Sequence, residues 1–262
     1  MKKLLLTFML AACMLFTAAC SAGSQAPAEP DYADDEAMTI IADGWNKRQI
    51  IVEDLNIADP DYKEKLKKGI RAEIDSDTPL KDRQFEDSQL QEDVLAYINS
   101  LNDQIEVVDT YSITDPDYVT EVTKASDARA KLLKKFVEDY DMKVDPKFQK
   151  YMDDLVSQGT SVSKDEAEKE AINSLVANIQ WETEENYGNY TYIAVVENTT
   201  DYNFENVSLL VNLYDADDVK TESSAFASSW KKGEKVKFEA YGGEVAASRI
   251  DTTVQYYTVI ED

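Results

Sequence analysis

The chain contains no histidine, and its only two cysteines, Cys13 and Cys20, lie close to the N-terminus. Histidine is the commonest general base, a frequent transition-metal ligand and the usual activator of a nucleophile. Beyond residue 20, the lack of cysteine excludes an internal disulfide, a zinc–thiolate site and a cysteine nucleophile. Walker A, dinucleotide-binding and Gly-x-Ser-x-Gly motifs are also absent. We therefore predict a protein that is not an enzyme and holds no cofactor or metal.

Basic residues are scarce relative to acidic ones. The 262-residue chain carries 27 Lys and Arg against 52 Asp and Glu, a net charge of −25. Such a surface repels phosphate backbones, which argues against nucleic acid as a partner. It also disfavours direct docking to anionic lipid. We interpret most of the acidity as a solvated surface that keeps the protein soluble. The length is sufficient for two modest domains.

The N-terminal segment has the layout of an export signal. Met1-Lys-Lys3 is positively charged, residues 4–16 are mostly apolar, and Thr17-Ala-Ala-Cys20 follows. The apolar run is shorter than the ~20 residues of a confident membrane span. Small residues before a cysteine resemble the lipobox of bacterial lipoproteins. The resemblance implies that residues 1–19 are a lipoprotein signal peptide. It also implies that Cys20 receives a diacylglyceryl group and palmitate-type acylation as the first mature residue.

Two alternatives stay open at this end of the chain. Leu10-Ala-Ala-Cys13 also fits the lipobox, although apolar residues 14–16 would then follow the anchor. The other alternative is an ordinary secretory signal with an incidental cysteine. Residues 20–33 read as a polar, flexible tether. We therefore expect Cys20 to anchor the protein to the extracellular face of the cell membrane, in a Gram-positive bacterium.

Residues 34–179 are predicted to form a helical domain. Apolar side chains recur there every three or four residues, which is the spacing of one helix face. Each such face must pack against another helix. Two arginines, Arg48 and Arg129, occupy positions within these apolar stripes. The stripes predict helices over about 38–55, 62–74, 90–108, 118–140, 148–155 and 167–175.

An internal repeat orders these helices. Residues 46–62 align without gaps on residues 102–118, at an offset of 56. Each copy reads as a long helix, a tight turn at Asp-Pro and a second helix. The repeat therefore predicts two helical hairpins in an up-down bundle. We interpret Tyr62 and Tyr118, which end the two copies, as core residues rather than ligand contacts.

The starts of several helices are predicted from capping residues. Asp59-Pro60, Asp115-Pro116 and Asp145-Pro146 each place an aspartate at the N-cap and a proline at the first helical position. Ser88 and Ser163 are each followed three residues later by Gln or Glu, which predicts two capping boxes. Capping explains the repeated Asp-Pro-Asp-Tyr better than a cation site does, because a hard cation needs more oxygen ligands.

Residues 180–262 are predicted to form a β domain. Residues 190–197 and 235–241 alternate between apolar and polar, and the apolar run Val207–Tyr214 is typical of a buried strand. Further strands are expected over residues 219–230, as a strand pair or edge, and over 251–260. About five to seven strands at this spacing predict an antiparallel β-sandwich of two sheets. The fold class is therefore α+β, with two domains.

Val211-Asn-Leu-Tyr-Asp215 resembles the motif of the FxLYD domain, which is found in exported and lipid-anchored bacterial proteins. The letters that match are Leu213, Tyr214 and Asp215. Val211 stands where the family has Phe, and Asp218 stands where it often has glycine. The resemblance covers roughly residues 190–260. It implies an Ig-like sandwich in which these residues are structural. The family is largely of unassigned function, so the resemblance implies no reaction.

We expect a non-catalytic binding, assembly or spacer module of the cell envelope. Beyond the membrane, its expected partner is an unknown envelope protein or wall component. One alternative is a cell-envelope hydrolase that acts through a carboxylate pair. Another is a calcium-responsive surface protein that uses Asp215–Asp218, although this segment lacks the glycine and the terminal glutamate of an EF-hand loop. The tyrosines of the β domain are either core or a recognition surface.

Overall fold

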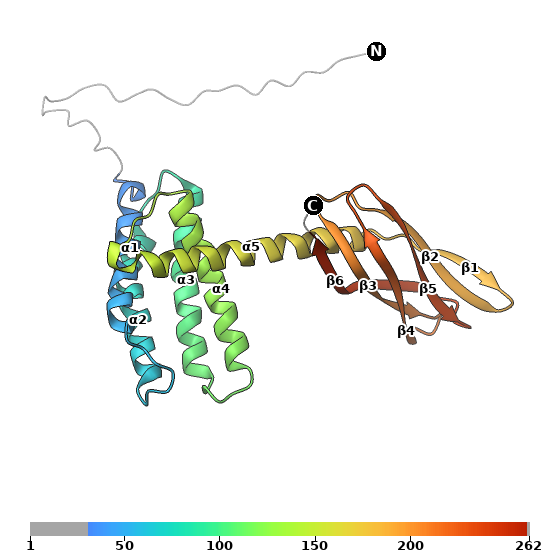
Figure 1. Ribbon diagram of the computed structural model, residues 1–262, viewed down its shortest axis with the longest axis horizontal. Helices are drawn as coiled ribbons and strands as arrows, with labels where there is room; N and C mark the ends of the chain where they lie inside the picture. Colours follow the sequence, from blue (N-terminus) through green and yellow to red (C-terminus); the bar gives the residue numbers. More distant parts are fainter. Residues whose placement is uncertain (1–30, 261–262) are drawn as a thin grey trace, which may run out of the picture.

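The computed structural model describes residues 31–260, which are helical in their first part and built of strands in their second (Figure 1). Cys13, Cys20 and most of the expected tether lie outside the described residues. Over residues 31–260, five α-helices precede six antiparallel strands arranged in two sheets. At this level, the predicted combination of helices and strands is confirmed. Within residues 31–260, no helix combines the length and the apolar character needed to span a membrane.

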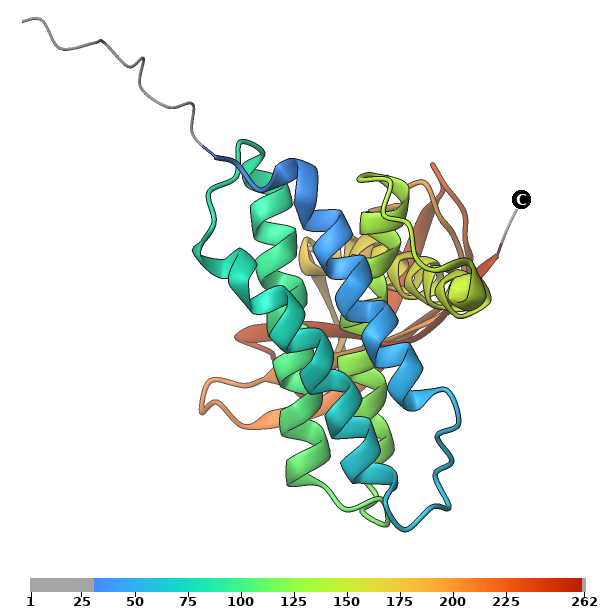
Figure 2. The same ribbon diagram turned by 90° about the vertical axis from the view of Figure 1, so that its left-hand side faces the viewer.

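The first four helices form the two hairpins indicated by the sequence repeat. Their bounds are α1 Asp34–Val52, α2 Tyr62–Asp77, α3 Ser88–Thr110 and α4 Tyr118–Glu138, with the 3₁₀ helix η1 (Thr78–Asp82) after α2. α1 packs on α2, α3 packs on α4, and contacts between α2 and α3 join the hairpins. Figure 2 shows α1 and α2 in front, with α3 and α4 behind them. Their apolar faces share a core that includes Trp45, Ile98 and Phe136.

Two of these helices begin later than the Asp-Pro pattern predicts. α2 and α4 start at Tyr62 and Tyr118, and the prolines lie in the preceding turns. In each turn, the tyrosine N–H donates over 3.1 Å to the carbonyl of the aspartate three residues earlier, Asp59 or Asp115. The predicted N-caps at these aspartates are therefore wrong, because their backbone closes a turn before the helix starts.

The other predicted caps differ in outcome. Asp145 is confirmed, since its carboxylate accepts the N–H of Lys147 at 2.8 Å and a proline opens the 3₁₀ helix η2 (Pro146–Phe148). The Ser88 prediction is wrong by one residue. Asp87 is the N-cap of α3, and its carboxylate accepts two backbone N–H groups of the first turn. A carboxylate is an equally good cap acceptor, which explains the shift.

The two short helices expected over residues 148–155 and 167–175 are one helix, α5 (Gln149–Ala177, 29 residues). Ser163 therefore caps nothing, and that prediction is wrong. Its hydroxyl donates to the carbonyl of Gly159 at 2.7 Å, one turn earlier in the same helix. At about 1.5 Å per residue, α5 is roughly 43 Å long.

The strands form two three-stranded sheets, in the orders β1-β2-β5 and β4-β3-β6. Their bounds are β1 Glu182–Asn186, β2 Asn189–Glu197, β3 Asn203–Tyr214, β4 Lys220–Trp230, β5 Lys235–Gly243 and β6 Arg249–Ile260. The apolar run predicted as a buried strand lies in β3, the central strand of its sheet, with alternate side chains buried. Residues 219–230 supply one edge strand, β4. Side chains of both sheets meet around Phe204, Trp230 and Phe238, so the arrangement is sandwich-like.

Helix α5 belongs to both parts of the chain (Figure 1). Met152, near its start, is buried in the helical core. Ile172 and Val176, near its end, are buried in the core of the sheets, and α5 contacts β6. The indole of Trp181, just beyond α5, donates to the hydroxyl of Thr252 on β6 at 2.9 Å. One continuous helix therefore connects the two cores.

Gly159 sets the distance between α5 and α4. A Cβ placed at Gly159 would lie 2.4 Å from the carbonyl oxygen of Ala130 on α4. That contact is with backbone, which cannot rotate aside as a flexible side chain can.

We therefore expect Gly159→Ala to lower the free energy of unfolding by about 1–3 kcal/mol, since the two helices must separate to admit the methyl group. In an open helix, the same change stabilises by about 1 kcal/mol. Urea unfolding of Gly159→Ala should be compared with that of Ser161→Ala, an exposed position on the same helix. A Gly159→Ala variant at least as stable as the native protein would contradict the close approach.

Candidate functional site

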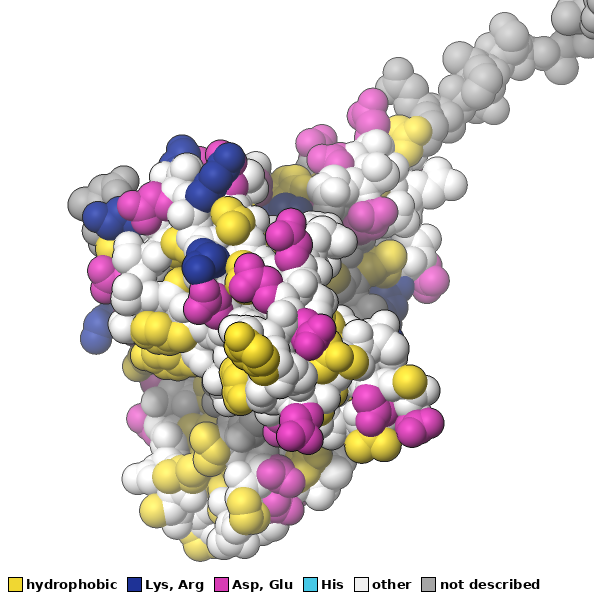
Figure 3. All heavy atoms as spheres, turned by 90° about the vertical axis from the view of Figure 1, so that its right-hand side faces the viewer, with side chains coloured by type: hydrophobic (Ala, Val, Ile, Leu, Met, Phe, Trp, Pro, Cys, Tyr) yellow, Lys and Arg dark blue, Asp and Glu magenta, His cyan; other side chains and the backbone are white. Residues whose placement is uncertain are grey.

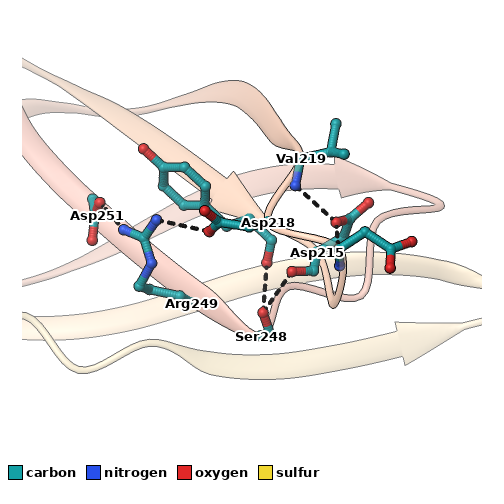
Figure 4. A network of polar contacts seen from close by, with 8 residues as sticks. Asp215, Asp218, Val219, Ser248, Arg249 and Asp251 are labelled. Carbon is teal, nitrogen blue, oxygen red and sulfur yellow. Dashed lines mark hydrogen bonds and ion pairs between the residues drawn. The ribbon is translucent and has the colours of Figure 1, made fainter.

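The resemblance motif occupies the end of β3 and the turn that follows it. Val211 and Leu213 are fully buried. The ring of Tyr214 is covered by the guanidinium of Arg249, whose central carbon lies 3.5 Å from the ring centroid. Arg249 also pairs with Asp251 and, at 3.1 Å, with Asp218 (Figure 4). The motif residues thus join the core to a surface turn.

The carboxylate of Asp215 organises that turn. It accepts the N–H groups of Asp217 at 2.9 Å and Val219 at 3.0 Å. The carbonyl of Asp215 accepts the hydroxyl of Ser248 at 2.7 Å (Figure 4). Asp218 has a φ of +60°, a left-handed conformation that glycine adopts without steric cost. Among residues 31–260, no group of three or more Asp, Glu, His or Cys is placed to hold a metal ion.

The tyrosines of the β part divide between core and surface. Tyr192 is fully buried, and its hydroxyl donates to the carbonyl of Val245 at 2.7 Å. Tyr187, Tyr241 and Tyr256 are mostly exposed. Figure 3, which looks toward the β end, shows apolar and acidic side chains interspersed. This distribution does not by itself define a recognition site.

A buried polar cluster lies between the helical hairpins, and the sequence reasoning did not predict it. Glu73 on α2 is fully buried and accepts from two arginines. Its Oε2 lies 3.0 Å from Nη1 of Arg48 on α1, and its Oε1 lies 2.7 Å from Nη2 of Arg129 on α4. The hydroxyl of Tyr97 also donates to Oε1. Nη1 of Arg48 donates in addition to the side-chain oxygen of Gln104, at 2.9 Å.

The cluster is built from equivalent positions of the two repeats. Arg48 and Gln104 are 56 residues apart, and so are Glu73 and Arg129. This separation equals the offset of the sequence repeat. Each of these pairs therefore joins a residue of one hairpin to its own counterpart in the other. Such contacts arise when two copies pack around an approximate twofold axis, as in an isologous interface.

Glu73 is ionised because of its two partners. Burial opposes its ionisation, but the charges of Arg129 and Arg48 and the bond from Tyr97 outweigh burial and hold the pKa of Glu73 below its usual value. Burial raises the pKa of Tyr97 well above its usual range, so its hydroxyl remains a donor. Two guanidinium groups thus share one carboxylate.

Asp77 lies one turn after Glu73 on α2 and differs from it in hydrogen bonding and in charge state. Its side chain is fully buried, and neither carboxyl oxygen has a hydrogen-bond partner among the described residues. Burial, followed by the negative charge of Glu73, raises the pKa of Asp77 to about 9. At neutral pH, Asp77 is therefore protonated. The cluster then contains two cations and one anion.

A groove reaches this cluster from the surface. Its volume is about 600 Å³, and each of α1 to α5 contributes lining residues. Arg48, Arg129 and Gln104 line it, together with apolar side chains such as Leu66 and Leu155. A chamber of about 140 Å³ between α2, α3 and α4 shares five lining residues with the groove, namely Arg48, Tyr62, Leu66, Gln104 and Ser126.

The repeat-ending tyrosines have different surroundings. Tyr118 is buried, and its pKa is raised to about 12, first by burial and then by Tyr62. Tyr62 is half-buried and lines both the groove and the chamber. The interpretation as core residues therefore fits Tyr118 better than Tyr62.

Glu73 and Asp77 are a carboxylate pair of the kind that the hydrolase alternative requires, with one group ionised and the other protonated. Both side chains are fully buried, and neither lines the groove or the chamber. A substrate in either space therefore cannot contact them. Their arrangement fits a structural role rather than hydrolysis.

Part of this cluster can be inferred from the sequence. Arg48 and Arg129 interrupt apolar stripes, and an arginine on a core face requires a buried partner. Glu73 and Asp77 follow Ile70 by three and seven residues, so they lie on the same helix face as that core residue. The groove could not be predicted from the sequence, because it depends on how α5 packs against the other helices.

Comparisons of the chain with known protein families, with curated proteins and with solved structures found no match.

The pH dependence of stability tests the buried Asp77. The folded chain keeps its proton up to about pH 9, whereas an unfolded aspartate loses it near about 3.9. Between these values the free energy of unfolding falls as pH rises, by at most about 1.4 kcal/mol per pH unit from this group. Asp77→Asn should remove that contribution, so we expect a gain in stability at pH 7 that disappears below about pH 4.

Urea unfolding of both proteins across this pH range measures the difference. Asp75→Asn, at an exposed position of the same helix, controls for the loss of one acidic side chain. A difference between Asp77→Asn and the native protein that stays constant with pH would show that Asp77 is ionised in the fold.

Proposed function

We propose that this chain is a lipid-anchored, non-catalytic module of the bacterial cell envelope that binds a partner and holds it at a set distance from its β part. The observation that carries the proposal is helix α5. Because it is buried at its start in the helical core and at its end in the core of the sheets, the two parts cannot swing freely. A rigid connection of roughly 43 Å suits a spacer or assembly role.

The N-terminal sequence supplies the membrane part of the proposal. The lipobox-like Thr17-Ala-Ala-Cys20 precedes a polar segment, and α1 begins at Asp34. Acylation of Cys20 would attach the helical part to the membrane through residues 20–33. Two acyl chains form a stable anchor, since each buried CH₂ contributes about 0.8 kcal/mol.

The resemblance of the strand part to the FxLYD domain is what supports an extracellular location. We propose that residues 180–262 are an Ig-like, FxLYD-type domain and that residues 34–179 are a separate helical domain. The buried Leu213 and the turn held by Asp215 are compatible with structural roles for the motif. The groove beside Arg48 favours the binding role within the proposal.

Cys20→Ala should move the protein from the membrane fraction to the medium or the soluble fraction, because the acceptor of the lipid is lost. We would fractionate cells that express the native chain, Cys20→Ala or Cys13→Ala and measure the share of each protein in the membrane. Mass spectrometry of the mature N-terminus would show whether Cys20 is modified. Cys13→Ala is the matched control and should stay in the membrane. Membrane retention of Cys20→Ala, or an unmodified Cys20 in the native chain, would contradict the proposed anchor.

A further inference from the structure

We propose that the groove and chamber of the helical part bind a small organic acid, namely a single carboxylate attached to an apolar group about the size of a phenyl ring. The carboxylate would pair with Arg48 and Arg129, and the apolar group would enter the chamber. The inference deepens the binding role proposed above and rests on it, but it does not depend on the lipid anchor.

The first argument is the charge at the base of the groove. Arg48 and Arg129 are 9% and 4% exposed, and within the described part of the chain the only ionised carboxylate bonded to them is that of Glu73. Buried charges in proteins are normally paired. One positive charge is therefore left over in a chain whose net charge is −25. A bound monoanion would balance it, whereas a dianion such as a phosphate monoester would exceed it.

The second argument is the unused donors. Arg48 donates to described residues only through Nη1, which leaves its Nη2 and Nε for a ligand. Nε of Arg129 is buried and has no hydrogen-bond partner among residues 31–260. A guanidinium offers paired N–H groups in a geometry that matches a carboxylate. Asp154, the acidic residue that lines the groove, is exposed on α5 and so is screened by solvent.

The third argument is the chamber. Its volume is about 140 Å³, and apolar side chains such as Leu66, Ile70 and Val122 form much of its wall. An apolar cavity of about 150 Å³ is large enough for benzene. Groove and chamber share Arg48 and four further lining residues. In the proposed complex, the acid places its charge in the groove and its ring in the chamber. Apolar walls with a few convergent polar groups are typical of small-molecule sites.

Isothermal titration calorimetry of the full chain with phenylacetate tests the inference. We expect a Kd of about 1 mM or tighter, as befits a ligand of this size. Phenylacetamide has the same shape without the charge and should bind at least about 10-fold more weakly. In NMR spectra, the Nε–H signals of Arg48 and Arg129 should shift with phenylacetate.

A parallel titration with N-acetyl-phenylalanine separates two sources of the same chemistry. Tighter binding than phenylacetate would identify the C-terminal residue of a peptide as the ligand. Weaker binding would identify a free acid. Both results support a carboxylate site.

Val122→Phe provides the decisive variant, since it fills the chamber and replaces no residue of the charged cluster. It should weaken phenylacetate binding at least about 10-fold. Val119→Phe, an exposed position on the same helix, makes the same substitution away from the chamber and should bind like the native chain. Thermal unfolding of both variants confirms that they are folded.

Three results would overturn the inference: no heat of binding up to about 10 mM phenylacetate, equal binding of the acid and the amide, or unchanged binding by folded Val122→Phe. None of them bears on whether Cys20 is acylated. A chain that is anchored but does not bind would therefore refute this site and leave the envelope location standing.

Discussion

The interaction on which the helical part depends is the carboxylate of Glu73 held between Arg48 and Arg129. These three residues come from α2, α1 and α4, so one buried anion joins both hairpins. Taking charges out of water costs several kcal/mol per ion, and the cost is recovered only when partners and geometry are good. The ionised Glu73 has both arginines and Tyr97, and a hairpin pairing in another register would separate them.

The same cluster connects the fold with its proposed function. Protonated Asp77 adds no charge, so two arginines face one anion and leave a positive base for the groove. Helix α5 closes one side of that groove with its first turns and reaches the sheets with its last. The same helix therefore contributes both to the wall of the groove and to the core of the sheets. A spacer and a binding site are compatible roles for one rigid chain.

The sequence anticipated features set by local patterns, and it failed where packing decides. The 3.6-residue stripes and the repeat predicted the hairpins, and the apolar run at Val207–Tyr214 predicted the central strand β3. The capping-box pattern at Ser163 predicts a helix start there. In the structure, α5 is helical on both sides of Ser163, so the pattern lies inside a helix. Glu73 and Asp77 could have been flagged by their spacing from Ile70. The unequal charge states of these two carboxylates could not be predicted, because they depend on partners that are distant in the sequence.

The stability of Glu73→Gln tests the central claim most directly. The substitution keeps the shape of the side chain and removes the one charge that both arginines share. If the carboxylate holds the hairpins together, urea unfolding at pH 7 should show a loss of about 3–5 kcal/mol, because two buried cations lose their counterion. Glu64→Gln, at an exposed position of the same helix, should change stability by less than about 0.5 kcal/mol. A Glu73→Gln variant as stable as Glu64→Gln would contradict the account.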